Sequence, residues 1–220
     1  MLMTRMVPVL QHKANDLERV IVYIDGYNVY HGLNSKGWRR LLWLDFSQLF
    51  AREMKPSQRL VAVKYFTATN RKQSKGATAR QENYLRVLEA AGVDVRSEGG
   101  FRRRSWKCSL CEEWTERPQE KRTDVSIAIE MVHDAHHDHC DTFWLMCADE
   151  DLIPAVSYVK QHHSDKVVVI VSPRGRRSLE LILSADAKRD VSRARLAAAQ
   201  FPEDVTVASG EQLRRPPEWT

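Results

Sequence analysis

The sequence predicts an α/β domain in which helices cover both faces of a central, mostly parallel sheet. Two observations support this fold class. Short apolar runs, typical of strands buried on both faces, alternate along the chain with longer segments whose apolar residues recur at helical spacing. The chain also has 220 residues, 43% of them hydrophobic, which is enough for one such domain with a substantial core.

Five apolar runs are expected to be the strands of the sheet. The first, residues 20–24, ends abruptly at Asp25 and Gly26. The clearest is residues 166–171, where Val-Val-Val-Ile-Val follows a lysine. The other runs are residues 60–66, 93–97 and 142–147, and a short edge strand is expected at 205–207.

Helical patterns fill the segments between these strands. Asp45 is expected to cap a helix over residues 45–53, and a second helix over 77–91 stops at Gly92, a normal helix end. Further helices are expected at residues 124–136, 152–163 and 177–185. Because strands and helices alternate, the strands are expected to run mostly parallel with helices on both faces.

The predicted elements make up one domain over residues 20–207. Residues 1–19 are polar and lack the apolar core of a signal peptide, so we expect a partly ordered extension. Residues 98–119 are expected to be an insertion rich in Cys and Arg, and residues 208–220 a loose tail. No apolar run approaches the length that crosses a bilayer, so the expected location is the cytoplasm. The oligomeric state stays open, a homodimer included.

Three clusters of basic residues stand out in a chain of net charge +5. Any single cluster is expected of an ordinary solvated surface. Each of these clusters, however, lies in a loop after a predicted strand or hairpin, and together they favour phosphate binding. They are Arg71, Lys72 and Lys75; Arg102, Arg103, Arg104 and Lys107; and Arg174, Arg176 and Arg177.

Acidic residues follow two of the predicted strands. Asp25 ends the first strand, and Asp149 and Asp151 follow the fourth. Asp124 lies in the first turn of the helix that leads into the fourth strand. Since the strands run parallel and this helix runs antiparallel to its strand, all four carboxylates are expected at one edge of the sheet. In open α/β sheets this carboxyl edge is where ligands bind.

Carboxylates that converge need a cation. Like charges at close range repel and raise one another's pKa, and Mg²⁺ or Mn²⁺ removes the conflict because both prefer oxygen ligands. Two such ions, roughly 4 Å apart, can activate a water molecule and stabilise the leaving oxygen of a phosphodiester. A single Asp after a strand is often only a helix cap. The joint placement is what favours a metal site.

Three segments resemble motifs of the NYN family, PIN-like nucleases of the LabA-like type. Residues 22–28 (Val-Tyr-Ile-Asp-Gly-Tyr-Asn) resemble its opening motif. Residues 120–125 resemble the second motif, which supplies an acidic residue at a helix start, and residues 147–154 resemble the third, usually Ser-Gly-Asp-Ser-Asp-Phe. Residues 178–186 resemble the closing segment. The resemblance spans roughly residues 20–190 in order, and the three acidic motifs together are specific.

This resemblance implies a three-layer, Rossmann-like PIN/NYN fold and a ribonuclease that hydrolyses RNA phosphodiester bonds with Mg²⁺ or Mn²⁺. It assigns the metal-site and catalytic roles to Asp25, Asp124, Asp149 and Asp151. Asn28 would orient a metal-bound water or a phosphate. A phosphatase of another Rossmann-like type is an alternative, although such enzymes commonly begin with an Asp-x-Asp pair that this chain lacks.

The third motif departs from the family pattern. Cys147 and Ala148 replace the usual Ser-Gly, which removes a hydroxyl and the backbone freedom of a glycine. Glu150 replaces a serine and adds a negative charge, which either points to solvent or tunes the site. These changes motivate an alternative reading, in which the chain is a non-catalytic RNA-binding or regulatory module that acts through partners.

Basic side chains would hold a single-stranded RNA by its backbone. Candidates are Arg102, Arg103, Arg104, Lys121, Arg174 and Arg176. Lys121 either meets the scissile phosphate or neutralises the carboxylates beside it. Trp106 and Trp114 either stack on unpaired bases or pack the insertion onto the domain. Backbone contacts position a strand without reading its bases, so low sequence selectivity and salt-sensitive binding are expected.

Cys108 and Cys111 form a lone CxxC. A structural zinc site needs four ligands, so Zn²⁺ would require partners from elsewhere, and a thiol pair in a turn is the alternative. Candidates to complete the site are His133, His136, His137, His139 and Cys140. The histidines also suit a solvated helix end, where protonated side chains interact favourably with the helix dipole. Four cysteines in 220 residues fit free thiols in a reducing compartment.

Overall fold

A sheet of seven strands forms the centre of the protein in the computed structural model, which describes residues 17–68, 74–107, 109–172 and 175–219. The strands are β1 (Glu18–Asp25), β2 (Gln58–Ala68), β3 (Asp94–Lys107), β4 (Trp114–Lys121), β5 (Thr142–Met146), β6 (Val167–Ser172) and β7 (Ala187–Asp190). Their order is β4-β3-β2-β1-β5-β6-β7, and every neighbouring pair is parallel except β3 with β4. The predicted mostly parallel sheet is confirmed.

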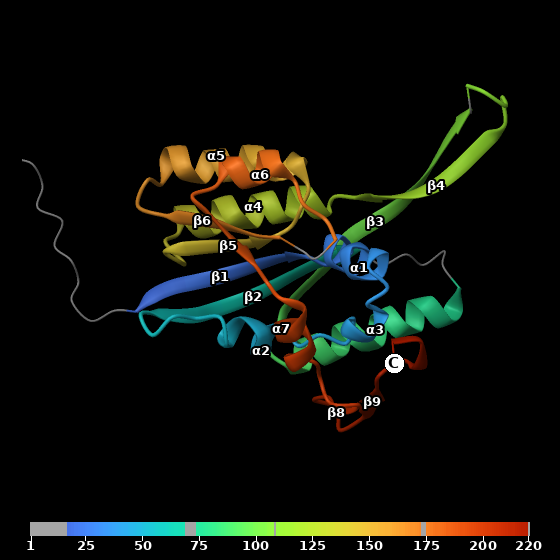
Figure 1. Ribbon diagram of the computed structural model, residues 1–220, viewed down its shortest axis with the longest axis horizontal. Helices are drawn as coiled ribbons and strands as arrows, with labels where there is room; N and C mark the ends of the chain where they lie inside the picture. The colour runs from blue at the N-terminus through green and yellow to red at the C-terminus, as the bar shows by residue number, and fades with distance from the viewer. Residues whose placement is uncertain (1–16, 69–73, 108, 173–174, 220) are drawn as a thin grey trace, which may run out of the picture.

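Helices cover both faces of this sheet, as Figure 1 shows. One face carries α4 (Thr123–His136), α5 (Ile153–His162) and α6 (Leu179–Ser184). The other carries α2 (Phe46–Ala51), α3 (Lys75–Ala90) and α7 (Arg193–Ala198), with α1 (Gly26–Ser35) directly after β1. Short 3-10 helices are η1 (Arg39–Leu41), η2 (Glu150–Leu152) and η3 (Pro217–Trp219). The three-layer α/β fold is therefore confirmed.

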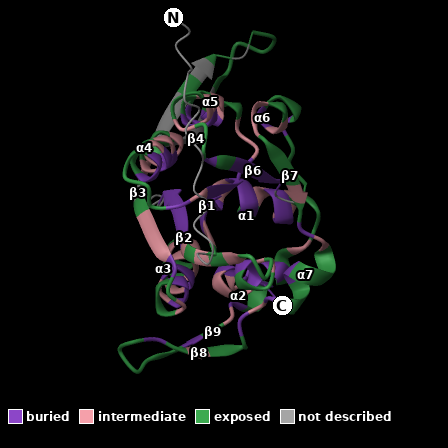
Figure 2. Ribbon diagram, turned by 90° about the vertical axis from the view of Figure 1, so that its left-hand side faces the viewer, coloured by how far each residue is buried: buried purple, intermediate pink, exposed green. Residues whose placement is uncertain are grey.

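The central strand β1 contributes to two cores because its side chains alternate between the faces of the sheet. Val20, Val22 and Ile24 pack in the core under α2 and α3, whereas Ile21 and Tyr23 pack in the core under α4 and α5. From Val20 onward this strand is buried, which the colouring of Figure 2 follows. A strand buried on both faces reads as a continuous apolar run, which is why its position was predictable from sequence.

The third predicted strand and the expected insertion form one long hairpin. β3 begins near the predicted start but runs to Lys107 instead of ending at residue 97. Its first part pairs with β2, and its second part, from Gly100 onward, pairs antiparallel with β4. This second part projects as an arm beyond the body of the domain (Figure 1). A two-stranded arm buries no face of its strands, so its sequence lacks the apolar pattern that a sheet strand shows.

Several elements were missing from the sequence prediction, among them α1, β7 and α7 in the body of the domain. The α1 segment contains Gly26, Asn28, Gly32 and Asn34, all residues of modest or low helix propensity. Its start depends on a local contact, because the Asp25 carboxylate accepts a hydrogen bond from the Asn28 backbone N–H at 2.9 Å. The predicted cap Asp45 does start α2, and Gly92, with φ +81°, follows α3 as expected.

The C-terminal segment corrects two predictions. The expected edge strand at 205–207 is β8 (Asp204–Thr206), which pairs with β9 (Gln212–Arg214) in a separate sheet. The tail expected to be loose is packed, because Trp219 is only 8% exposed and its ring lies 5.6 Å from that of Tyr84. The packing of Trp219 against Tyr84, which is distant in sequence, holds this segment in place. The composition of the segment alone does not indicate such a contact. No helix in the described part of the chain is long and apolar enough to span a membrane.

Candidate active site

The strand order reverses between β1 and β5, and the predicted acidic residues flank this point. Going outward from β1, the chain fills β2 and β3 on one side and β5 and β6 on the other. Ile24 pairs with Met146, so β1 and β5 end at the same level of the sheet. Asp25 closes β1, and Asp149 lies in the turn after β5. Open α/β sheets bind ligands in the crevice outside such a topological switch point.

Asp25 is the buried member of the group, with 2% of its surface exposed. One carboxylate oxygen accepts the Asn28 backbone N–H at 2.9 Å as the cap of α1. The other accepts the Asn28 side-chain amide and the Cys147 thiol, whose sulfur lies 3.3 Å away. Burial raises the pKa of Asp25, and these three hydrogen bonds oppose the rise. Asn28 thus holds Asp25 directly.

Cys147 connects the two strand ends. Its thiol faces Asp25, and its sulfur also accepts the Asp149 backbone N–H at 3.2 Å. Burial and the neighbouring Asp25 charge raise the pKa of the Cys147 thiol well above its usual range. The thiol therefore stays protonated and donates to Asp25, as a serine hydroxyl at this position would.

Asp149 and Asp151 are more accessible. Asp149 is half-buried and caps η2, where it accepts the Asp151 backbone N–H at 3.1 Å. The Asp151 side chain is exposed. Glu150, between them, turns away and accepts a hydrogen bond from the hydroxyl of Ser178 at 2.8 Å. Ser178 is the cap of α6, so Glu150 ties η2 to that helix and does not join the carboxylate group.

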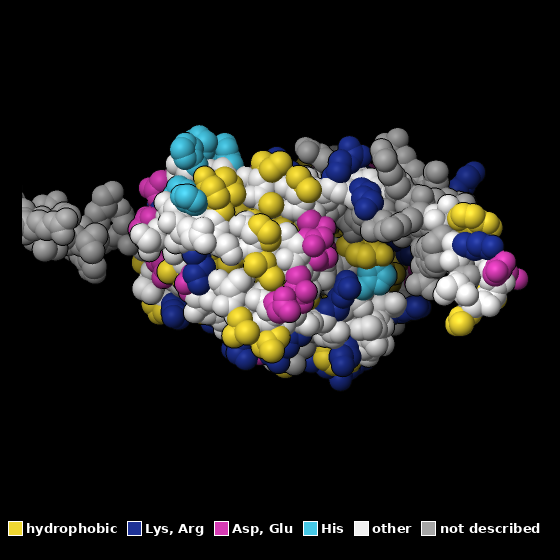
Figure 3. Space-filling view, turned by 90° about the horizontal axis from the view of Figure 1, so that it is seen from above, with side chains coloured by type: hydrophobic (Ala, Val, Ile, Leu, Met, Phe, Trp, Pro, Cys, Tyr) yellow, Lys and Arg dark blue, Asp and Glu magenta, His cyan; other side chains and the backbone are white. Residues whose placement is uncertain are grey.

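The electrostatic surroundings of Asp124 indicate that the four carboxylates lie near one another. The chain leaves the β4 arm through Arg122, whose φ of +81° turns it into α4, and this places Asp124 in the first helical turn. Burial first, and then repulsion from Asp25, Asp149 and Asp151, raises the pKa of Asp124 to about 6. On the side of the molecule covered by α4, α5 and α6, acidic side chains lie near the middle of the view, with basic and histidine side chains beside them (Figure 3).

The four carboxylates lie near one another, but their oxygen atoms are not yet close enough to share one ion. Within the described residues, no three of these carboxylates bring one oxygen each within 4.8 Å of one another. Asp25 is fixed by its three hydrogen bonds, so closing the group around an ion would require rotation of the more exposed Asp149 and Asp151 side chains. Side chains that repel one another are expected to stay apart until a cation joins them.

The predicted RNA-binding residues are placed in part. Arg176 and Lys36 line a surface pocket of about 490 Å³ beside α1. Lys121 is exposed at the base of the arm, paired with Gly100 in the β3–β4 ladder. Arg102, Arg103 and Arg104 lie on the arm strand β3, but their side chains are outside what the structure describes. Arg71, Lys72 and Arg174 lie outside the described residues altogether.

Sequence reasoning missed an aromatic group next to Asp25. The ring of Tyr27 lies 4.1 Å from that of His31 and 6.1 Å from that of Phe101. Burial and the charge of Arg176 lower the pKa of His31, while the charge of Asp25 acts in the opposite direction. The spacing of Tyr27 and His31, one helical turn apart, would have revealed this group if α1 had been predicted.

The zinc site expected around the CxxC is not assembled from the proposed partners. Cys108 lies outside the described residues, and Cys111 is exposed in the turn at the end of the arm. The expected partners His133, His136, His137 and His139 lie at the opposite end of α4 from the arm. Cys140 is buried in the core, and burial raises its pKa to about 12. Within the described residues, these candidate ligands therefore do not come together with Cys111.

Comparisons with known proteins agree on the fold class. A family model described as NYN domain matches residues 19–191. The chain is 27% identical over 225 residues to the 6-hydroxy-3-succinoylpyridine 3-monooxygenase HspA of Pseudomonas putida, which covers 84% of this chain and 70% of that protein. It also resembles the crystal structure of a protein of unknown function, VPA0982, from Vibrio parahaemolyticus, with a TM-score of 0.58 and 18% identity, over 83% of this chain and 98% of that one.

Proposed function

This chain belongs to the NYN domain family, and from that premise we propose that it is a metal-dependent ribonuclease that hydrolyses RNA phosphodiester bonds. The observation that carries the proposal is the gathering of Asp25, Asp124, Asp149 and Asp151 at the switch point of the sheet. A group of mutually repelling carboxylates at a ligand-binding edge is what a divalent cation site requires.

The donor set fits Mg²⁺ or Mn²⁺. All four side chains offer carboxylate oxygens, the ligands that these hard cations prefer, and Asp149 and Asp151 are accessible from solvent. A bound ion would supply a Lewis acid at the scissile phosphate. Asp25, anchored by Asn28 and Cys147, provides the fixed ligand of the group.

The surroundings suit a polyanionic strand. Arg176 and Lys36 lie on one side of α1, and Lys121 lies at the base of the arm near Asp124. The arm carries Arg102, Arg103 and Arg104 beyond the same edge of the sheet. Contacts of this kind go to phosphates, so we propose single-stranded RNA bound with low sequence selectivity.

Asp149→Asn tests the proposal, with Glu150→Gln as its matched neighbour. Asp149 belongs to the carboxylate group, whereas Glu150 points to Ser178 and away from it. With Mn²⁺ and a labelled single-stranded RNA, Asp149→Asn is expected to lose at least a hundredfold in kcat, and Glu150→Gln to stay within threefold of wild type. Equal cleavage by wild type and Asp149→Asn, with both folded by circular dichroism, would refute the assignment.

A second candidate is an RNA-binding module without turnover. The favouring observation is that three hydrogen bonds already engage the Asp25 carboxylate, one of them from a cysteine where the family usually has a serine. In the same assay this candidate predicts that the labelled RNA is retained by wild-type protein with Mn²⁺ but is never cut.

A third candidate follows from the monooxygenase relative, whose name states chemistry on a hydroxylated pyridine ring. The favouring observation is an aromatic pocket next to Asp25, lined by Tyr27, His31 and Tyr65. Incubation of the protein with 6-hydroxy-3-succinoylpyridine, dioxygen and a two-electron donor decides it. Consumption of the pyridine faster than in protein-free controls would support this candidate over RNA cleavage.

A further inference from the structure

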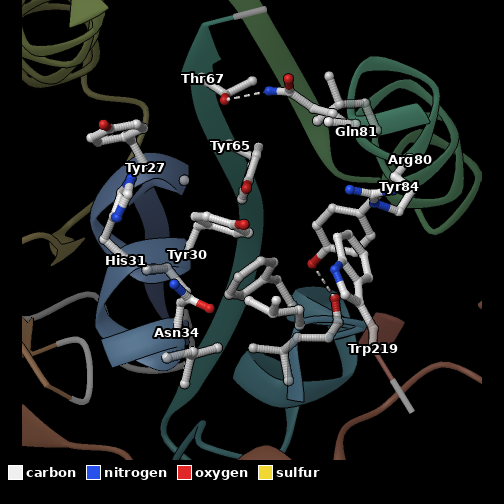
Figure 4. A pocket seen from close by; sticks show the side chains of 18 of the residues that line it. Tyr27, Tyr30, His31, Asn34, Tyr65, Thr67, Arg80, Gln81, Tyr84 and Trp219 are labelled. Atoms are coloured by element: carbon white, nitrogen blue, oxygen red, sulfur yellow. Dashed lines mark hydrogen bonds between the residues drawn. The ribbon is translucent and has the colours of Figure 1, made fainter. Parts of the chain in front are cut away.

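A pocket of about 430 Å³ lies beside the carboxylate group, between α1, α3 and the carboxyl half of β2 (Figure 4). It begins at Gly26 and Tyr27, the two residues that follow Asp25 in the chain. Aromatic side chains line much of it: Tyr27, Tyr30, Tyr65, Tyr84, Phe101 and Trp219. The polar side chains His31, Asn34, Thr67 and Gln81 also face it.

The walls of this pocket are held in place by contacts of their own. A Cβ atom at position 26 would lie 2.4 Å from the Tyr65 ring, so only glycine allows Tyr65 to lie against the start of α1. The Tyr84 hydroxyl donates to the Leu44 carbonyl at 2.7 Å. An ion pair between Arg80 and Glu218, at 2.7 Å, fixes the segment that carries Trp219. The pocket is therefore formed before any ligand arrives.

Its chemistry selects a flat, largely uncharged ring. Aromatic walls favour a planar partner with a π face, because stacking of this kind accepts any aromatic ring. The Asn34 side-chain N–H can donate to a ring nitrogen or an exocyclic oxygen of a heterocycle, because its own oxygen already accepts from Arg39 at 2.8 Å. The Gln81 amide N–H groups already donate to Thr67 and to the Ala68 carbonyl, so the Gln81 oxygen offers an acceptor. The cation among the lining residues, Arg80, is already paired with Glu218. A volume of about 430 Å³ is within the range of small-molecule sites.

We propose that this pocket binds a planar nitrogen heterocycle, and that in the bound RNA this ring is the unpaired base of the nucleotide next to the scissile phosphate. The second half rests on the proposed ribonuclease function, because only then does a strand lie across Asp25. Tyr27 and His31 line the pocket at the start of α1, directly after Asp25, and their rings lie 4.1 Å apart, so they are placed to hold the splayed base. A free heterocycle of similar size presents the same ring without a backbone.

Ala77→Phe, with Ala79→Phe as its control, tests the pocket. Ala77 lines the pocket from α3, whereas Ala79 is exposed on the same helix outside it. We expect adenosine 5′-monophosphate and 2-hydroxypyridine, titrated calorimetrically, to bind wild type and Ala79→Phe alike and Ala77→Phe at least tenfold more weakly. For RNA cleavage, Ala77→Phe is expected to raise KM at least tenfold with kcat within threefold of wild type.

The outcomes separate the two halves of the proposal. Binding of neither probe by wild type, or equal binding by both Phe variants, overturns the pocket. Binding of 2-hydroxypyridine alone keeps the ring site and overturns its assignment to an RNA base. Asp149→Asn is expected to bind adenosine 5′-monophosphate as wild type does. If the wild-type protein does not cut RNA, and Ala77→Phe still weakens the binding of adenosine 5′-monophosphate, the pocket is supported while the ribonuclease function fails.

A second inference comes independently from the histidines at the end of α4. The rings of His133, His137 and His139 lie 4.2, 5.5 and 5.6 Å apart, pair by pair, and all three side chains are exposed. Ligand atoms of His133, Asp134 and His139 lie within 4.8 Å of one another. This cluster is at the amino edge of the sheet, at the opposite end of α4 from Asp124.

Hydrogen bonds preset the tautomers of two of these rings. His139 Nδ1 lies 2.9 Å from a carboxylate oxygen of Asp134, and His137 Nδ1 lies 2.9 Å from the carbonyl oxygen of His133. Both oxygens can only accept, so each Nδ1 carries the hydrogen and each Nε2 keeps its lone pair. The Asp134 side chain is 1% exposed and is anchored by Lys64 at 2.7 Å. Metal-ligating histidines normally have such a partner on their other nitrogen.

We infer that His133 and His139, whose ligand atoms lie within 4.8 Å of each other and of Asp134, form a site for Zn²⁺ or a similar divalent ion, separate from the carboxylate group. Neutral imidazole nitrogens suit Zn²⁺, whereas carboxylates suit Mg²⁺ and Mn²⁺. Exposure of the two rings leaves room for water to complete a tetrahedral set.

Zinc titration of His139→Ala tests this site, with His162→Ala as control because His162 lies at the end of α5 in a contact with Tyr158. All variants are made in the Asp149→Asn background, which is expected to weaken the binding of Zn²⁺ to the carboxylate group. One equivalent of Zn²⁺ is expected to bind the background protein and His162→Ala equally, and His139→Ala at least tenfold more weakly. Equal zinc affinity in His139→Ala and His162→Ala overturns the inference.

Discussion

At the scale of single residues, the buried carboxylate of Asp134 is expected to stabilise the fold in a way that depends on pH. Burial alone would raise its pKa, but hydrogen bonds from Lys64, Tyr23 and His139 outweigh this and lower the pKa below its ordinary value. A carboxylate whose pKa is lower in the folded state than in the unfolded chain stabilises the fold above the unfolded pKa of about 3.9. That contribution is lost as the pH falls through the lower, folded pKa.

We therefore expect Asp134→Asn to reduce the free energy of unfolding at pH 7 by about 3 kcal/mol, since it leaves Lys64 under-paired in a buried position. The difference from wild type should shrink below about pH 4. Urea unfolding at several pH values measures both effects. Asp190→Asn is the matched control: Asp190 is exposed and pairs with the exposed Arg177 at 3.2 Å, so it should change stability by less than about 0.5 kcal/mol. A constant difference across pH would contradict the assignment.

Cys147 is the residue at which this chain departs from the family pattern, and its hydrogen bonds predict the outcome of replacing it. Cys147→Ser keeps a donor to Asp25 and an acceptor for the Asp149 N–H, whereas Cys147→Ala removes both. We expect Cys147→Ala to lower the free energy of unfolding by about 1–3 kcal/mol, because a buried acceptor loses a partner, and Cys147→Ser to cost less. Chemical denaturation of the pair measures this. Equal losses would show that volume, and not hydrogen bonding, decides.

At the scale of elements, the start of α1 depends on glycine. The Tyr65 ring lies where a Cβ atom at position 26 would be, at 2.4 Å. Gly26→Ala is therefore expected to lower the free energy of unfolding by about 1–3 kcal/mol, as overpacking does. Gly76→Ala is the matched control in α3, where the nearest atom would be 3.6 Å away at the end of a flexible Arg80, and it should be neutral or slightly stabilising.

Tyr65→Leu in the Gly26→Ala background should recover part of the lost stability, because it removes the atoms that clash. Thermal unfolding of the three variants measures this. If Gly26→Ala and Gly76→Ala have the same melting temperature, the contact between Tyr65 and α1 is not as tight as the structure shows.

The elements that sequence predicted well share one property: local sequence determines them. β1 and β6 are continuous apolar runs because both of their faces are buried. The start of α2 was predicted from its N-cap residue, Asp45. α1 was not predicted, because its glycine and asparagine residues weaken the helical pattern in the sequence. Its position depends instead on the hydrogen bond from the Asn28 N–H to Asp25 and on the contact of Gly26 with Tyr65. The arm was not predicted as a hairpin, because a two-stranded hairpin outside the core needs no apolar face. In the site, the strand ends predicted which acidic residues lie near one another. They did not predict the aromatic pocket, whose walls come from segments spread between residues 26 and 219.

At the scale of the whole molecule, two edges of one sheet carry different chemistry. The carboxyl edge holds the carboxylates, the aromatic pocket and the base of the arm. The amino edge holds the histidine cluster at the far end of α4. Because α4 carries Asp124 in its first turn and His133 in its last, this helix spans the distance between the two groups. A cation at one edge is therefore expected to leave affinity at the other unchanged.

The arm is the feature of the whole molecule that most plainly extends the carboxyl edge. From Gly100 to Lys107, β3 pairs with β4, so the arm is an addition to the main sheet and its removal should leave the core intact. Phe101 pairs with Glu120, which allows residues 102–119 to be replaced by an Asn-Gly turn that closes a two-residue hairpin. Such a variant loses Arg102, Arg103 and Arg104 but keeps Lys121 and Asp124.

This variant is expected to keep its melting temperature within a few degrees, roughly what a change of 1 kcal/mol produces in a domain of this size. Its RNA affinity should fall, and the slope of log affinity against log salt should become less steep by about 2, as loss of roughly three phosphate contacts to a single strand implies. Fluorescence anisotropy with Asp149→Asn as the cleavage-deficient background measures the slope. Arg102, Arg103 and Arg104 changed together to Gln, with the arm retained, should give most of the same change because charge, and not the hairpin itself, carries the effect. An unchanged slope in both variants would place the RNA on the Arg176 side of the site and leave the arm without a part in binding it.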